Sequence, residues 1–273
     1  MEFSEVIFKF SPNQPWNDIL IAYLSELEFD SFQEFDAGLK GYIDTTKFNL
    51  KTIESICNKI DCHIEIEEKL VKKQNWNAEW ESDFQPILID NRCGIRADFH
   101  ESLDVDFEIV ITPKMSFGTG HHATTEGMII EMLDISFNDK KVLDMGCGTA
   151  VLAILAKKLG ANTVLAIDIE EWAFENAKEN IFNNQCIDID VIMGDKSKIK
   201  GNFDIVLANI NRNILLDDIS TYSHHMQSNS LLLLSGFYFH DLNLIKEEAK
   251  KNNLRYIQHI TKDNWVIAKF EKY

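Results

Sequence analysis

The stretch VLDMGCGTAVL, residues 142–152, decides the fold of this 273-residue chain. Its first residues are apolar and suit a buried strand, and apolar residues continue after Ala150 as in a buried helix. Between them, Gly146 and Gly148 let the backbone turn sharply and approach a ligand, while the start of the helix offers unpaired N–H groups. The stretch therefore predicts a strand, a turn that binds a nucleotide-like cofactor, and a helix.

The same strand–helix alternation continues on both sides of this stretch and fills residues 106–273. The strand-like runs are 108–112, 141–144, 163–168, 189–193, 205–209 and 231–237, and the helical stretches are 124–133, 150–159, 171–183, 214–226 and 241–250. Two last strand-like runs flank Lys262-Asp263-Asn264, as in a hairpin. This order predicts a Rossmann-like α/β domain whose sheet is mostly parallel, with a C-terminal antiparallel hairpin.

The first 105 residues follow a different pattern. Residues 1–70 read β-α-β-β-α-β, the order of a ferredoxin-like α+β domain; the strand-like runs are 4–10, 32–36, 39–44 and 62–67, and the helical stretches 15–27 and 50–60. In residues 71–105, Trp76, Trp80 and Phe84 are spaced as on one helical face, which predicts a packed linker helix before Pro86. Two short strands, at 87–90 and 94–99, are expected to follow.

Composition limits the classes of partner. The chain carries 27 Lys and Arg against 44 Asp and Glu, a formal charge of −17, so broad contact with a nucleic-acid backbone is not expected. The five cysteines are scattered and form no C-x-x-C pair, which predicts free thiols and no metal site. The N-terminus does not read as a signal peptide, and the run Leu231–Leu234 is too short to cross a bilayer. We expect a cytoplasmic monomer without a membrane partner.

Two acidic residues and one valine favour one cofactor over another. Asp168 ends the strand that follows the glycine turn, where its carboxylate can bind ribose hydroxyls of a dinucleotide or of S-adenosylmethionine. The dinucleotide fingerprint requires a small residue at position 151, and this chain has Val151. Asp144, just before the turn, suits a ligand with an ammonium group and would repel a pyrophosphate. The turn therefore favours S-adenosylmethionine, and an NAD-dependent oxidoreductase is disfavoured.

Several motifs together resemble a known family. VLDMGCGTAVLAI followed by VLAIDIEEWAFENAKENIFNN resembles motifs I and II of class I methyltransferases. ITPKMSFGTGHHATT, residues 111–125, resembles the signature of the PrmA family, which methylates the eleventh protein of the large ribosomal subunit. NWNAEWESDFQP is similar to the linker of that family, and LANINRNILLDD to its substrate-side motif. The resemblance covers essentially the whole chain.

The resemblance implies an activity and a substrate. It implies methylation of lysine side chains and of the N-terminal amine, up to the trimethylated state, with the ferredoxin-like domain holding the ribosomal protein. The chain departs from the family pattern at Ala150, where a third glycine is usual, and we expect Ala150 to have an ordinary helical backbone. Ala123 replaces a common proline and Lys114 a common glycine.

The cofactor contacts are expected along the carboxyl ends of the strands. We expect the loop with Phe117 and Gly118 to close over the methionine end of the cofactor, and the Thr125 hydroxyl to bind its carboxylate, with an ordinary helix cap as the alternative for Thr125. Gly146 and Gly148 would contact the methionine and ribose portions through the backbone, beside Asp144. Asp168 would bind the ribose. Asp195 would contact the adenine, unless it is an ordinary loop residue.

Asn209 is the predicted catalytic residue. It ends the run 205–209, and its carbonyl oxygen can accept a hydrogen bond from the amine to be methylated. Enzymes that methylate planar nitrogens have Asn-Pro-Pro-Tyr there, whereas this chain has Asn209-Ile210-Asn211-Arg212 and no aromatic residue, which favours an aliphatic amine. The adjacent His121 and His122 do not face one another, and no metal is assigned to them.

Two other functions stay open from the residues alone. One is a class I methyltransferase that acts on another protein or on a small molecule. The other is a non-enzymatic factor that binds the ribosomal protein, with Ala150 marking a decayed cofactor site. The acidic surface suits a basic protein partner in either case, because long-range attraction speeds encounter.

Overall fold

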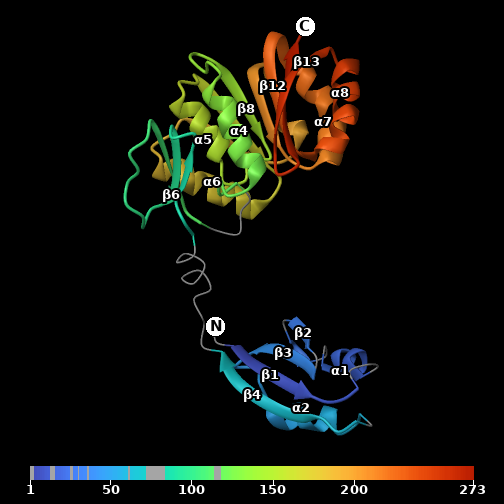
Figure 1. Ribbon diagram of the computed structural model, residues 1–273. Helices are drawn as coiled ribbons and strands as arrows, with labels where there is room; N and C mark the ends of the chain where they lie inside the picture. The colour runs from blue at the N-terminus through green and yellow to red at the C-terminus, as the bar shows by residue number, and fades with distance from the viewer. Residues whose placement is uncertain are drawn as a thin grey trace. The chain divides into compact units, whose positions relative to one another are not determined.

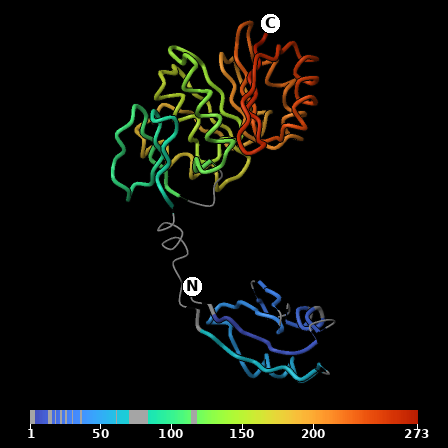
Figure 2. Tube along the Cα trace, viewed as in Figure 1, coloured from blue at the N-terminus to red at the C-terminus, as the bar shows by residue number. Residues whose placement is uncertain are grey.

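The computed structural model describes residues 3–12, 16–24, 27–29, 31–35, 37–60, 62–71, 84–113 and 118–273. The chain divides into two compact units, residues 1–80 and 81–273, and the boundary falls inside the predicted 71–105 segment (Figure 1; Figure 2). The predicted linker helix lies outside the described residues except for its last residue, Phe84. That side chain is buried in the core of the second unit.

In its described residues, the N-terminal unit forms a four-stranded antiparallel sheet with two helices. Its elements are β1 (Phe3–Lys9), α1 (Trp16–Leu24), β2 (Ser31–Phe35), β3 (Gly38–Asp44), α2 (Leu50–Cys57) and β4 (Glu65–Val71). The strand order is β2-β3-β1-β4, so each helix connects two strands that have one other strand between them, as in a split β-α-β unit. Apolar residues from the sheet and from both helices, including Phe8, Leu20 and Ile53, form a single core.

The second unit is built on a seven-stranded sheet. Its strands are β8 (Lys141–Met145), β9 (Thr163–Asp168), β10 (Ile189–Met193), β11 (Phe203–Asn209), β12 (Met226–Tyr238), β13 (Leu254–Lys262) and β14 (Trp265–Lys272). They lie in the order β10-β9-β8-β11-β12-β14-β13; the first five are parallel, and β14 is antiparallel to both of its neighbours. The predicted Rossmann-like domain with its C-terminal hairpin is confirmed.

Helices cover both faces of this sheet (Figure 1). The helices are α4 (Ala123–Leu133), α5 (Val151–Lys158), α6 (Glu171–Asn183), α7 (Arg212–His224) and α8 (Leu242–Lys251), with short 3₁₀ turns η2 (Lys196–Lys198) and η3 (Phe239–Asp241). Successive strand residues point to opposite faces. Val142 accordingly packs in one core with residues of α4, α5 and α6, and Leu143 packs in the other with residues of α7 and α8.

The run predicted at 108–112 does not join the parallel sheet. It forms β7 (Phe107–Ile111), which pairs with β6 (Cys93–Ala97) and, through it, with β5 (Ile87–Ile89) in a separate three-stranded sheet. Side chains of α6 and of its C-cap residue occupy the other edge of β7. The Asn184 amide donates to the Val110 carbonyl at 2.5 Å and accepts from the Val110 N–H at 2.9 Å, and the Asn180 carbonyl oxygen accepts from the Thr112 N–H at 2.7 Å. These amides take the place of a neighbouring strand.

All five cysteines are free. In the part of the chain that the structure describes, no helix has the length and apolar character needed to cross a membrane. Among the same residues, no group of three or more His, Cys, Asp and Glu side chains is arranged to hold a metal ion.

Candidate active site

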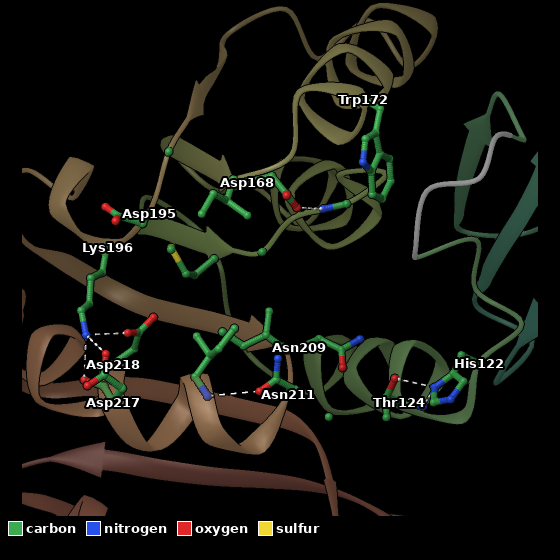
Figure 3. Close-up of a pocket in the computed structure, with 18 of the residues that line it drawn as sticks. His122, Thr124, Asp168, Trp172, Asp195, Lys196, Asn209, Asn211, Asp217 and Asp218 are labelled. Carbon is green, nitrogen blue, oxygen red and sulfur yellow. Dashed lines mark hydrogen bonds and ion pairs between the residues drawn. The ribbon is translucent and has the colours of Figure 1, made fainter. Parts of the chain in front are cut away.

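A cavity of about 590 Å³ lies at the carboxyl ends of the parallel strands (Figure 3). Each of the five parallel strands contributes residues to it near or just beyond its end: Gly146, Asp168, Gly194, Asn209 and Gly236 are examples. Ligands of open α/β sheets bind at this edge. Of the sequence-predicted residues, the structure brings Gly146, Gly148, Asp168, Asp195 and Asn209 together around this cavity.

The glycine turn after β8 is held by its own backbone. The N–H groups of Gly146 and Cys147 both donate to the Ile167 carbonyl, at 2.8 and 3.1 Å. Gly146, Gly148 and Ala150 all have positive φ, at 71°, 53° and 62°. The expectation of an ordinary helical backbone at Ala150 is wrong: the residue is left-handed and precedes α5 as its N-cap. The turn needs this conformation, which costs an alanine about 1–2 kcal/mol.

Asp168 links the turn to the next strand and faces the cavity. One carboxylate oxygen accepts the Gly148 N–H at 2.8 Å, and the other accepts the Glu170 N–H at 3.1 Å. A carboxylate has about four acceptor positions, so each oxygen retains capacity for a hydroxyl donor. The side chain is both fixed by the backbone and able to bind a ribose diol.

Asp144 does not line the cavity. The residue is 1% exposed, and its carboxylate accepts the Ala153 N–H at 3.0 Å. Asp144 therefore stabilises the first turn of α5 from inside the core. Burial, together with the nearby charge of Asp168, raises the pKa of Asp144 to about 7, although the hydrogen bond from the Ala153 N–H acts in the opposite direction. The structure therefore shows a support for the turn where the sequence predicted contact with the ammonium group.

Asn209 lines the cavity, and its side chain contains an unpaired acceptor. Its amide nitrogen lies 3.4 Å from the Thr125 hydroxyl, and its buried carbonyl oxygen Oδ1 has no hydrogen-bond partner among the described residues. A buried polar atom without a partner is rare, because it costs about 1–3 kcal/mol. The position therefore fits a ligand that brings an N–H or O–H donor.

The start of α4 supplies a different threonine from the one predicted. Thr125 is fully buried and contacts Asn209, whereas Thr124 lines the cavity. His122 is the N-cap of α4: its ring nitrogen Nδ1 accepts from the Thr124 N–H and lies 2.7 Å from the Thr124 hydroxyl. The hydroxyl predicted for the cofactor thus positions the amide of Asn209.

The loop before α4 meets the glycine turn. Gly118 has φ +101°, and its carbonyl accepts a hydrogen bond from the Thr149 hydroxyl at 2.7 Å. A Cβ at this position would lie 2.8 Å from that same hydroxyl oxygen, which explains the glycine. Gly118 is not among the residues that line the cavity, and Phe117 lies outside the described residues.

Asp195 lies at the opposite end of the cavity from His122 (Figure 3). Its carboxylate caps η2 by accepting the Ser197 N–H at 2.9 Å, and hydrogen bonds from the Ser197 hydroxyl and N–H lower the pKa of Asp195. Next to it, Lys196 forms ion pairs with Asp217 and, at 2.9 Å, with buried Asp218. This bridge between η2 and α7 closes that end of the cavity.

Several lining residues were not predicted individually. Ile169 and Trp172 follow Asp168 and are 68% and 50% exposed, and Ile214 on α7 is 45% exposed. Exposed apolar side chains around one cavity are typical of a ligand-binding site. The sequence could have indicated these three residues, because Ile169 and Trp172 closely follow Asp168 and Ile214 closely follows Asn209. Trp265 also lines the cavity, but nothing near it in the sequence marked it.

Solved structures share this architecture. A ribosomal protein L11 methylase from Lactobacillus delbrueckii subsp. bulgaricus superposes with a TM-score of 0.63 at 27% identity, over 70% of this chain and 99% of that one. A methyltransferase from Pyrococcus furiosus has the same fold, with a TM-score of 0.51 at 19% identity over 60% and 89% of the two chains. With the cavity at the strand ends, the fold defines a class I methyltransferase.

Sequence comparison narrows the class to a family. The family model described as ribosomal protein L11 methyltransferase (PrmA) matches residues 18–273. The chain is 45% identical to the ribosomal protein L11 methyltransferase of Bacteroides thetaiotaomicron and 42% identical to that of Phocaeicola vulgatus, in each case over 99% of both chains. The chain belongs to this family of enzymes.

Proposed function

We propose that the chain transfers methyl groups from S-adenosylmethionine to amino groups of ribosomal protein L11, on lysine side chains and on the N-terminal amine. Asn209 carries the proposal, because it lines the cavity at the end of β11 and its side chain holds a carbonyl oxygen without a hydrogen-bond partner among the described residues. The family model and the named relatives support the same substrate.

The residues around the cavity fit S-adenosylmethionine. Asp168 retains acceptor capacity for the ribose, and Ile169, Trp172 and Ile214 offer apolar surface for the adenine ring. Gly146 and Gly148 keep the backbone open to a ligand. When bound, the cofactor supplies a methyl group on a positively charged sulfur, so the amine lone pair forms the N–C bond while the C–S electron pair goes to sulfur.

The protein's part in this reaction is to desolvate and orient the amine. A lysine ammonium has a pKa near 10.4 in water and must lose a proton before it attacks. A narrow site with a nearby positive sulfonium lowers that pKa. Asn209 then accepts one N–H of the neutral amine and aligns its lone pair, and Thr125 holds the Asn209 amide in place.

The residues that follow Asn209 also indicate which kind of nitrogen is methylated. The residues after Asn209 are Ile210, Asn211 and Arg212, and Asn211 caps α7 by accepting the Ile214 N–H at 3.2 Å. None of these three residues is aromatic, so this segment lacks the ring that would stack on a planar amide or base, which supports an aliphatic amine as substrate.

We further propose that the N-terminal unit holds the ribosomal protein. A protein that binds RNA carries Lys and Arg to neutralise phosphates, and the formal charge of −17 on this chain attracts such a protein. The contribution is to encounter rate, and it falls as salt rises.

The test is methyl transfer from labelled S-adenosylmethionine into unmethylated large-subunit proteins, with labelled products identified by mass spectrometry. We expect label on lysines and the N-terminus of ribosomal protein L11. The cofactor affinity is measured by calorimetry. If the chain binds the cofactor tightly but the label appears only on another molecule, the proposed substrate is wrong and the enzyme class still holds. Absence of cofactor binding would overturn the proposal and favour a factor that only binds the ribosomal protein.

A further inference from the structure

Strand β12 contains a bulge beside the cavity. Between its pairs with Ala268 and Val266 of β14, β12 has one residue more than its partner strand. The bulge includes Ser235 and Gly236: the buried Ser235 hydroxyl donates to the Val266 carbonyl at 2.8 Å, and Gly236 has φ +96°. Such bulges are common next to active sites, where they change the direction of a strand or a side chain.

Gly236 lies directly against the backbone of Ile210, the residue after Asn209. A Cβ at position 236 would lie 2.1 Å from the Ile210 carbonyl oxygen and 2.7 Å from the carbonyl carbon. Real Cβ atoms stay at least 3.0 Å from such atoms, so the two backbones would have to separate by about 1 Å. The close approach therefore requires a glycine here, in addition to the positive φ.

The side chain of Ile210 contacts the glycine turn on the cofactor side. A Cβ at Gly146 would lie 2.2 Å from the γ2 methyl group of Ile210. Ile210 is thus held by Gly236 through its backbone and by Gly146 through its side chain. All three residues line the cavity, and Asn209 and Asn211, which flank Ile210, are labelled in Figure 3.

These contacts fix the place of the amine acceptor. Asn209 is joined to Ile210 by one peptide bond, and it pairs with Ser235 in the parallel ladder. A shift of the Ile210 backbone would therefore move the Asn209 side chain relative to the glycine turn. Methyl transfer needs the nitrogen, the methyl carbon and the sulfur in line, and a misplacement of about 1 Å can lower the rate about a hundredfold.

We propose that Gly236 is a positioning residue for methyl transfer. Its bulge holds the Ile210 backbone, and Ile210 in turn sets the Asn209 side chain at the correct distance from the cofactor turn. This inference rests on the proposed amine methylation.

The test compares Gly236→Ala with Gly201→Ala as a matched control. Gly201 also has positive φ, at 83°, but a Cβ there would meet nothing within 4 Å, and Gly201 does not line the cavity. Both variants place an alanine in the left-handed region, so both should lower the melting temperature by a few degrees. The single-turnover rate of methyl transfer to ribosomal protein L11 should fall roughly thirty- to hundredfold in Gly236→Ala only.

Cofactor affinity distinguishes positioning from binding. Calorimetric titration with S-adenosylmethionine should give Gly236→Ala a Kd within about threefold of the wild-type value, because the loss belongs to the transfer step. The side chain of Ile210 gives a second test of the same segment. Ile210→Val keeps the γ2 methyl group that contacts Gly146 and should retain most of the rate, whereas Ile210→Ala should lower it about tenfold.

The outcomes separate this inference from the proposed function. An unchanged transfer rate in folded Gly236→Ala would overturn the positioning role, and so would an equal loss in Gly201→Ala. A loss of cofactor affinity as large as the loss of rate would also overturn it. Should Gly236→Ala fail to fold, equal rates in Ile210→Val and Ile210→Ala would do so. A wild-type enzyme that methylates no amine of ribosomal protein L11 would overturn the proposed function itself.

Discussion

The two sides of the cavity satisfy their polar groups in different ways. On the glycine-turn side, the carboxylates of Asp144 and Asp168 accept backbone N–H groups of Ala153, Gly148 and Glu170. On the other side, the Asn209 carbonyl oxygen has no partner among the described residues. The polar groups of the glycine-turn side are therefore paired without a ligand, whereas the Asn209 side keeps one unpaired acceptor. Substitutions on the two sides should therefore separate stability from catalysis.

The largest expected effect is a loss of kcat on substitution of Asn209. Asn209→Ala should lower kcat about a hundred- to a thousandfold, the range for removal of one pre-positioned hydrogen-bonding group. The melting temperature should hardly change, because the native side chain makes one long contact, at 3.4 Å. Methyl-transfer kinetics and thermal unfolding measure the two quantities. Asn209→Asp keeps an acceptor oxygen and should retain more activity; a fall in stability without loss of kcat would contradict the comparison.

On the glycine-turn side, Asp168→Ala should reduce both stability and cofactor affinity. It leaves the N–H groups of Gly148 and Glu170 without their acceptor, at a cost of about 1–3 kcal/mol in the free energy of unfolding. Urea unfolding and calorimetric titration with S-adenosylmethionine give the two values. Asp168→Asn retains one acceptor oxygen and should lie between. Loss of affinity with full stability would show that the backbone contacts are dispensable.

A smaller, pH-dependent effect belongs to Asp144. Because its pKa is raised to about 7, the folded chain holds a proton that the unfolded chain loses between about pH 4 and 7. The free energy of unfolding should therefore fall as pH rises through this window, by up to about 1.4 kcal/mol per pH unit.

Urea unfolding at several pH values between about 5 and 7 checks this slope. Asp144→Asn keeps an acceptor for the Ala153 N–H and should remove the slope. Glu108, whose pKa is lowered to about 2 mainly by its hydrogen bond with Arg96, stabilises fully above its ordinary pKa and adds no slope in this range. An unchanged slope in Asp144→Asn would contradict the assignment.

The smallest effect is expected at Ala150. Ala150→Gly relieves about 1–2 kcal/mol of left-handed strain, but it loses a buried methyl worth about 0.8 kcal/mol and adds freedom to the unfolded chain. The net change should be below about 1 kcal/mol. Ala153→Gly, in the helical backbone of α5, gains no such relief and should cost clearly more. Equal losses would show that Ala150 is not strained.

The sequence predicted the framework well because its periods are clear. The strands at 163–168 and 189–193 and the helix at 171–183 were predicted with the bounds that the structure shows. Alternating β and α units leave few arrangements of a parallel sheet, and the ends of its strands then mark the cavity. Gly146, Asp168 and Asn209 could be placed there for that reason.

Other features depend on contacts that no local pattern shows. The separate sheet of β7 arises from amides more than 60 residues further along the chain. Trp265 reaches the cavity only through the pairing of β14 with β12. The position of Asp144 had a signal that was not used: it shares the strand face of Val142, two residues earlier, and that face lies against α5.

The amide contacts along β7 have a consequence for association between chains. The outer edge of a short sheet carries unpaired N–H and C=O groups, and such edges recruit strands from other molecules and promote aggregation. At β7, the side chains of Asn180 and Asn184 already occupy these groups at Val110 and Thr112. An amide side chain cannot be extended into a further strand, so the part of this edge at Val110 and Thr112 offers no template to a second copy.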